Sequence, residues 1–87
     1  MYQVLFLEDA ERDLKQLDPT IAKRIYKRIQ WLADNFEHIP PESLTGEWER
    51  FFKFRVGDYR IIYKTLHDEH LIAIYRVRHR REVYERK

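Results

Sequence analysis

Apolar and polar residues follow two different periods along the chain. From residue 9 to residue 36 the apolar side chains recur every three or four positions, as on one face of an α-helix. From residue 50 to residue 78 they recur at every second position, as in strands with one buried face. A short apolar run, Tyr2–Leu7, comes first and suits a strand. The pattern predicts an α+β protein with the order β-α-α-β-β-β.

Two helices are expected in the first part. One covers Asp9–Leu17, and the second begins after Asp18, which suits the N-cap position and is followed by Pro19. The apolar stripe of the second helix comprises Ile21, Ala22, Ile25, Ile29, Leu32, Ala33 and Phe36. Its opposite side carries Lys23, Arg24, Lys27 and Arg28, which we interpret as a solvated face.

Two consecutive prolines, Pro40 and Pro41, cannot continue a helix, and a loop is expected over residues 37–47. Three strands should follow, at Arg50–Val56, Tyr59–Leu66 and Leu71–Arg78, and then a short basic tail, His79–Lys87. Gly57-Asp58 between two β-rich runs is typical of a two-residue hairpin turn. We expect a single domain, residues 1–87, with two helices on one face of a small, mostly antiparallel sheet.

A two-residue turn fixes the register of the first hairpin. It pairs Val56 with Tyr59, Arg55 with Arg60, and Lys53 with Ile62, because partners are counted outward from the turn. The face expected to pack on the helices carries Phe52, Phe54, Ile61 and Tyr63. The other face carries Phe51, Lys53, Arg55, Arg60 and Ile62.

Arg55 and Arg60 should therefore face each other, and like charges in such a pair repel. Either an anion lies between them, or both side chains splay into solvent or pair with nearby acidic residues. Lys53 adds a third positive charge to the same face, which favours anion binding. The third strand and the tail add Arg76, Arg78, His79, Arg80, Arg81 and Tyr84. Which of Arg76 and Arg78 joins the first two arginines depends on the second turn, whose length is ambiguous.

Charge and composition narrow the class of protein. The net charge of +2 combines −4 over residues 1–49 with +6 over residues 50–87. Such a division is seen in proteins that bind nucleic acid or acidic partners, and it also arises from random clustering on a solvated surface. The absence of Cys excludes disulfides, thiolate zinc sites and thiol nucleophiles. No apolar run approaches the ~20 residues that span a bilayer, and no signal peptide is evident. We expect a soluble cytoplasmic protein without membrane partners.

Several segments resemble the RelE/ParE toxin superfamily. They are Leu44-Thr45-Gly46, the run Phe52-Lys53-Phe54-Arg55-Val56-Gly57-Asp58-Tyr59-Arg60-Ile61-Ile62-Tyr63, and the ending Val77-Arg78-His79-Arg80-Arg81-Glu82-Val83-Tyr84. The opening strand and Glu11-Arg12-Asp13-Leu14 are also similar to the family's first elements. The resemblance covers essentially the whole chain, and its last segment is similar to the RelE-like branch.

The resemblance implies the toxin of a type II toxin–antitoxin system. RelE-like toxins enter the ribosomal A site and cut mRNA there without a metal or other cofactor. The 2′-hydroxyl of one nucleotide attacks the adjacent phosphorus, and a 5′-hydroxyl leaves. The expected partners are a cognate antitoxin, the ribosome with its 16S rRNA, and mRNA; direct DNA binding is not expected.

The resemblance also implies roles for individual residues. Lys53 corresponds to a lysine that helps to activate the 2′-hydroxyl, Arg60 to the arginine on the phosphate, and Arg80 to the arginine near the leaving group. Tyr84 corresponds to a tyrosine that stacks on or orients a displaced nucleotide. The expected phosphate- or RNA-binding set is Arg55, Arg76, Arg78, His79 and Arg81. His79 is a second candidate for the general base, because imidazole titrates near neutral pH.

One departure keeps other functions open. Some RelE toxins carry a second lysine where this chain has Phe51. A ParE-like inhibitor of DNA gyrase has the same fold and is an alternative. A catalytically degenerate family member that binds RNA or the ribosome without cutting is another.

Overall fold

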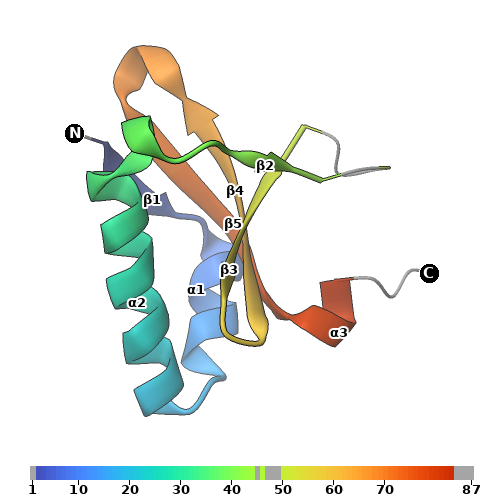
Figure 1. Ribbon diagram of the computed structural model, residues 1–87. Coiled ribbons are helices and arrows are strands. Elements are labelled where there is room, and N and C mark those ends of the chain that lie inside the picture. The colour runs from blue at the N-terminus through green and yellow to red at the C-terminus, as the bar shows by residue number, and fades with distance from the viewer. Residues whose placement is uncertain (1, 45, 47–49, 84–87) are drawn as a thin grey trace.

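Two helices pack on one side of a five-stranded sheet (Figure 1). The computed structural model describes residues 2–44, 46 and 50–83. The elements are β1 (Gln3–Phe6), α1 (Glu8–Lys15), α2 (Pro19–Asp34), β2 (Glu42–Ser43), β3 (Phe52–Val56), β4 (Tyr59–Leu66), β5 (Leu71–His79) and α3 (Arg80–Val83), with 3₁₀ turns at Phe36–His38 and His67–Glu69. The strand order is β1-β5-β4-β3-β2, and β1 runs parallel to β5 while the other pairs are antiparallel. The expected α+β architecture is confirmed.

Local signals place the second helix as expected. Asp18 Oδ1 accepts a hydrogen bond of 2.8 Å from the backbone N–H of Thr20, and Pro19 opens α2. The helix ends at Asp34, and the 3₁₀ turn that follows carries Phe36 into the core. The helical stripe that the sequence predicts therefore reaches Phe36 through a tighter turn rather than through α-helix. None of the helices in the described ranges is long and apolar enough to cross a membrane.

The core lies between the helices and the sheet. Ile61 and Tyr63 of β4 are fully buried there, and Phe52 and Phe54 of β3 pack against it, which confirms the predicted inner face. Burial, with a smaller contribution from the charge of Glu42, raises the pKa of Tyr63 from 10.0 to about 12.

Strand pairing settles the register of both hairpins. The pairs predicted for β3 and β4 are present, including Arg55 with Arg60. Between β4 and β5 the register shifts, so that Ile62 lies opposite Arg76 but Tyr63 lies opposite Ile74. Tyr75 is the extra residue of this β-bulge. Beyond the bulge Arg78 lies opposite Arg60, so Arg78 is the arginine that continues the row.

Two segments differ from the sequence prediction. Residues 37–47 are not loop throughout, because Glu42 and Ser43 form β2 against Lys53 and Phe52. The prolines favour an extended backbone, and a short edge strand can follow them directly. The first residues of the predicted tail also belong to regular elements: β5 continues to His79, and α3 spans Arg80–Val83. Arg80 N–H donates a 2.7 Å hydrogen bond to the carbonyl of Asp58, which holds α3 at the β3–β4 turn.

Candidate functional site

Four arginines surround an open hollow of about 360 Å³ at the turn end of β3 and β4. The described residues that line it are Arg55, Gly57, Arg60, Arg80 and Arg81. We call this cavity the arginine hollow. Arg55 and Arg60 are cross-strand partners, while Arg80 and Arg81 come from the start of α3. So many guanidinium groups around one cavity favour an anionic ligand, which phosphate oxygens suit through bidentate hydrogen bonds.

Arg60 forms the inner wall of the arginine hollow. The residue is 7% exposed, and its Nη1 donates to the carbonyl of Arg80 at 3.4 Å. Its side chain therefore does not splay into solvent, one of the two arrangements that the sequence left open. Arg55, its partner across the hairpin, is exposed. The pair thus combines a fixed, buried cation with a cation that can move toward a ligand.

The β3–β4 turn and α3 support each other beside the hollow. Asp58 accepts the backbone hydrogen bond of Arg80, and its carboxylate lies 3.9 Å from Arg80 Nη1. His79 Nδ1 accepts a 3.3 Å hydrogen bond from the backbone N–H of Arg81. Gly57 has φ of +59°, the left-handed conformation in which a residue with Cβ is strained. These contacts hold the backbone of Arg80 and Arg81 in place, and so determine the positions from which their side chains extend.

Lys53 does not line the arginine hollow. It lies on β3 two residues before Arg55, and its side chain is 18% exposed. Its Nζ forms a 3.5 Å ion pair with Glu42 of β2. The unpredicted strand β2 thus supplies the acidic neighbour of the lysine that the sequence singled out.

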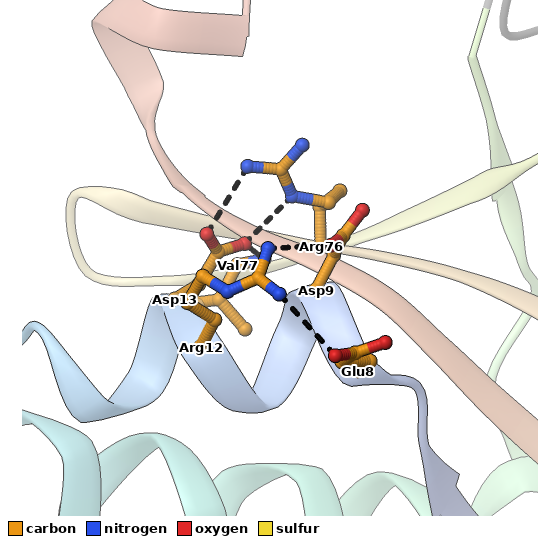
Figure 2. Close-up of polar contacts among 6 residues, drawn as sticks. All are labelled: Glu8, Asp9, Arg12, Asp13, Arg76 and Val77. Atoms are coloured by element: carbon orange, nitrogen blue, oxygen red, sulfur yellow. Dashed lines mark hydrogen bonds and ion pairs between the residues drawn. The ribbon is translucent and has the colours of Figure 1, made fainter.

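Arg76 is held by Asp13 of α1 (Figure 2). Arg76 Nε and Nη2 donate to the two carboxylate oxygens of Asp13 at 2.8 and 3.1 Å. The same carboxylate accepts a 2.9 Å hydrogen bond from the backbone N–H of Val77. This guanidinium therefore joins α1 to β5, and Arg76 is not among the described residues that line the arginine hollow.

A second hollow of about 320 Å³ lies beside the end of β5. The described residues that line it are Asp13, Gln16, Leu17, Tyr59, Arg76, Val77, Arg78 and His79. The rings of Tyr59 and His79 meet edge to face, with centroids 5.3 Å apart. The structure thus separates the predicted RNA-binding residues: Arg55 and Arg81 line the arginine hollow, and Arg76, Arg78 and His79 line the second.

Phe51, the residue at the family's second lysine position, packs with other side chains. Its ring lies 4.8 Å from that of Tyr75, and Lys64 Nζ is 4.7 Å from its centroid. Tyr84, the last predicted catalytic residue, lies outside the described residues. Within the described ranges no three His, Asp or Glu side chains gather as metal ligands.

Comparison with known proteins identifies the family. Residues 4–84 match the family model of the ParE toxin of the type II toxin–antitoxin system parDE. The chain belongs to the RelE/ParE family of type II toxins.

Proteins with RelE-type names match nearly the full length of this chain. A RelE-like toxin protein of Escherichia coli is 34% identical, with 95% of this chain and 90% of that protein aligned. Toxin RelG of Mycobacterium tuberculosis is 33% identical, with 98% of each chain aligned. The toxin–antitoxin complex RelBE2 of the same organism contains a similar chain, with a TM-score of 0.79, 29% identity, and coverage of 90% of this chain and 96% of that one.

Proposed function

We propose that this toxin is a ribosome-dependent endoribonuclease that cuts mRNA in the A site. The observation that supports the proposal is the arginine hollow, in which Arg55, Arg60, Arg80 and Arg81 converge. Cleavage by 2′-hydroxyl attack passes through a phosphorane with added negative charge, and cations fixed in advance stabilise that charge best. In this proposal guanidinium groups, rather than a bound metal, supply the positive charge.

Arg60 and Arg80, the two proposed catalytic arginines, are held in place by different contacts. Arg60 is buried and directed by a hydrogen bond to the backbone, so it would hold the phosphate throughout the reaction. Arg80 is tied to the turn by its backbone N–H, while its side chain is 62% exposed. Arg80 would lie near the leaving 5′-oxygen, and Tyr84 would stack on or orient a displaced nucleotide.

Two residues remain candidates for the general base. Lys53 lies on the same face of β3 as Arg55. His79 directly precedes Arg80 in the chain and lines the second hollow. The pH–rate profiles of Lys53→Ala and His79→Ala distinguish them, since loss of the base removes its limb from the profile.

The proposed partners are the ribosome, its mRNA and a cognate antitoxin. The similar chain in the RelBE2 structure is part of a toxin–antitoxin complex. We propose that an antitoxin likewise holds this toxin inactive, and that the free toxin acts in the cytoplasm, where it stops translation.

The test is primer extension on a defined mRNA bound to ribosomes. We expect the unmodified toxin to cut within the A-site codon, and Arg60→Ala or Arg80→Ala to cut about 100-fold more slowly, since each removes a cation from the transition state. Arg12→Ala is the matched control, because Arg12 is bonded to Glu8 and Asp9 on α1 and does not line either hollow described above. Cleavage by Arg60→Ala and Arg80→Ala at the rate of Arg12→Ala would contradict the assigned roles.

A second function has one observation in its favour. The family model that matches is that of ParE, and ParE-like inhibition of gyrase is the alternative that the sequence left open. A supercoiling assay with purified gyrase tests it directly. Ribosome binding without cleavage would instead indicate the degenerate binding protein.

A further inference from the structure

Arg24 of α2 lies against the β3–β4 turn, although the sequence placed it on a solvated helix face. A Cβ built on Gly57 would collide with Nη2 of Arg24. The absence of a side chain at Gly57 therefore does two things: it permits φ of +59°, and it leaves room for the guanidinium of Arg24. Gly57 itself lines the arginine hollow, so Arg24 lies against a residue of its lining without being one of the described lining residues.

The surroundings of Arg24 are positively charged. The hollow beyond Gly57 is lined by four more arginines, and the acidic residue of the turn, Asp58, lies beside Arg80. Arg24 makes no hydrogen bond or ion pair with the part of the chain that the structure describes. A cation held against other cations is unfavourable unless an anion joins them, so this position suits a ligand with more than one negative charge.

An RNA backbone has that chemistry. Each nucleotide adds one phosphodiester, so a strand with one phosphate in the arginine hollow presents a second phosphate at its rim. Guanidinium groups bind phosphate oxygens through two parallel hydrogen bonds. We propose that Arg24 binds the phosphodiester next to the one in the arginine hollow, so that α2 forms one wall of the RNA path. This inference rests on the proposed function, since it takes RNA as the ligand of the hollow.

The experiment compares Arg24→Ala with Lys23→Ala. Both residues are exposed neighbours on α2, and both substitutions remove one positive charge from the helix surface. A labelled 12-nucleotide single-stranded RNA is titrated with each variant at several salt concentrations. We expect Arg24→Ala to bind about fivefold more weakly and its salt dependence to decrease by about 0.7 in log–log slope, the effect of one lost phosphate contact. Lys23→Ala should match the unmodified toxin.

A second measurement separates binding from chemistry and identifies the RNA. In single-turnover cleavage on ribosomes, Arg24→Ala should raise the toxin concentration needed for half-maximal cleavage by a larger factor than it lowers the rate at saturation, since Arg24 would contact a neighbouring phosphate and not the reacting one. Weaker binding to the programmed ribosomes alone would assign the phosphate to mRNA and support the inference. Equally weaker binding to vacant ribosomes would assign Arg24 to rRNA and overturn the inference. Arg24→Lys, which keeps the charge but not the bidentate geometry, should fall between Arg24→Ala and the unmodified toxin.

Three other results would also overturn the inference. One is an Arg24→Ala variant equal to Lys23→Ala in affinity and salt dependence while the unmodified toxin binds and cuts RNA. Another is unchanged RNA binding with weaker binding of the antitoxin, which would assign Arg24 to a protein partner. The third is a lower melting temperature that accounts for the loss of affinity. Failure of the unmodified toxin itself to cut mRNA on ribosomes would contradict the proposed function instead.

Discussion

The part that a single residue plays in this toxin depends on its burial as much as on its amino-acid type. Arg60 is buried, whereas most arginines in proteins lie at the surface. Burial of a guanidinium is costly in free energy unless the group is hydrogen-bonded or its charge is paired with an anion. Its position opposite Arg55 follows from the hairpin register, and its Nη1 is directed by a hydrogen bond to the carbonyl of Arg80, the first residue of α3. The charge is thereby fixed in direction before a ligand arrives, which is the arrangement that stabilises a charged transition state.

Burial also predicts the behaviour of Tyr63 at alkaline pH. Its pKa is about 12 in the folded protein and 10.0 as a reference for the unfolded chain, so the unfolded state loses this proton first. The free energy of unfolding should therefore be unaffected by Tyr63 below pH 10 and should fall as pH rises from about 10 to about 12. The two-unit difference corresponds to about 2 to 3 kcal/mol.

The measurement is urea unfolding of the unmodified toxin and of Tyr63→Phe between pH 8 and about 12, in steps of half a unit. Phe cannot ionise, so its curve should fall less steeply above pH 10, while other tyrosines and lysines affect both proteins alike. Parallel curves over this range would show that Tyr63 does not contribute to the alkaline loss of stability.

At the scale of elements, α1 holds the free edge of β5. Strand β1 pairs with β5 as far as Ile74, and beyond that point the carboxylate of Asp13 takes the backbone N–H of Val77. The same carboxylate binds Arg76 through two hydrogen bonds, as Figure 2 shows. The C-terminal half of β5, which carries Arg78 and His79, is thus anchored by one side chain of a helix more than sixty residues earlier in the chain.

Removal of this anchor should destabilise the protein. Asp13→Ala leaves Arg76 and the Val77 N–H without their acceptor, and we expect a loss of about 2 to 3 kcal/mol in the free energy of unfolding. Asp9→Ala is the control. Asp9, like Asp13, lies on α1 and binds an arginine, but its partner is Arg12 of the same helix and its side chain is 58% exposed. That change should cost less than about 1 kcal/mol, since exposed ion pairs contribute little. Denaturant unfolding compares the two, and equal losses would show that the contact with β5 is not special.

At the scale of the whole molecule, positive charge gathers where β3, β4 and α3 meet. The second half of the chain carries +6 and the first half −4. The fold does not simply display this division, because Arg76 is joined to Asp13 and Lys53 to Glu42 of the acidic half. Four described arginines, Arg55, Arg60, Arg80 and Arg81, line the arginine hollow, which makes it a strongly positive site.

That concentration predicts that RNA binding depends on salt. If the toxin neutralises one phosphate in the arginine hollow and a second at Arg24, the log–log slope of affinity against salt should be about −1.4. Affinity for a short single-stranded RNA should then fall about sevenfold between roughly 50 and 200 mM salt. Fluorescence anisotropy measures it directly. A slope near zero would mean that the hollow does not bind the RNA backbone.

The local pattern of the sequence determined the elements and the first hairpin. The helical stripe, the Asp18 cap and the Gly57-Asp58 turn are short-range signals, and short-range geometry is enough to set which residues of β3 and β4 face each other. The same pattern could not show β2, because two residues after a pair of prolines carry no periodicity. It could not show the bulge at Tyr75 either, because a one-residue shift depends on packing along the whole hairpin.

The sequence determined one part of the candidate site, and the tertiary structure decided the rest. The sequence determined that Arg55 and Arg60 share a face and that further arginines follow in the last strand and tail. Only the tertiary structure decided which of these arginines lie together. Arg80 N–H binds the carbonyl of Asp58, and Arg80 and Arg81 line the arginine hollow. Asp13 binds Arg76 instead, and Arg24 of α2 lies against Gly57. The physical reason is that the charge and periodicity of a residue are local properties, whereas its ionic neighbours come from elements distant in the chain and meet only when the core packs.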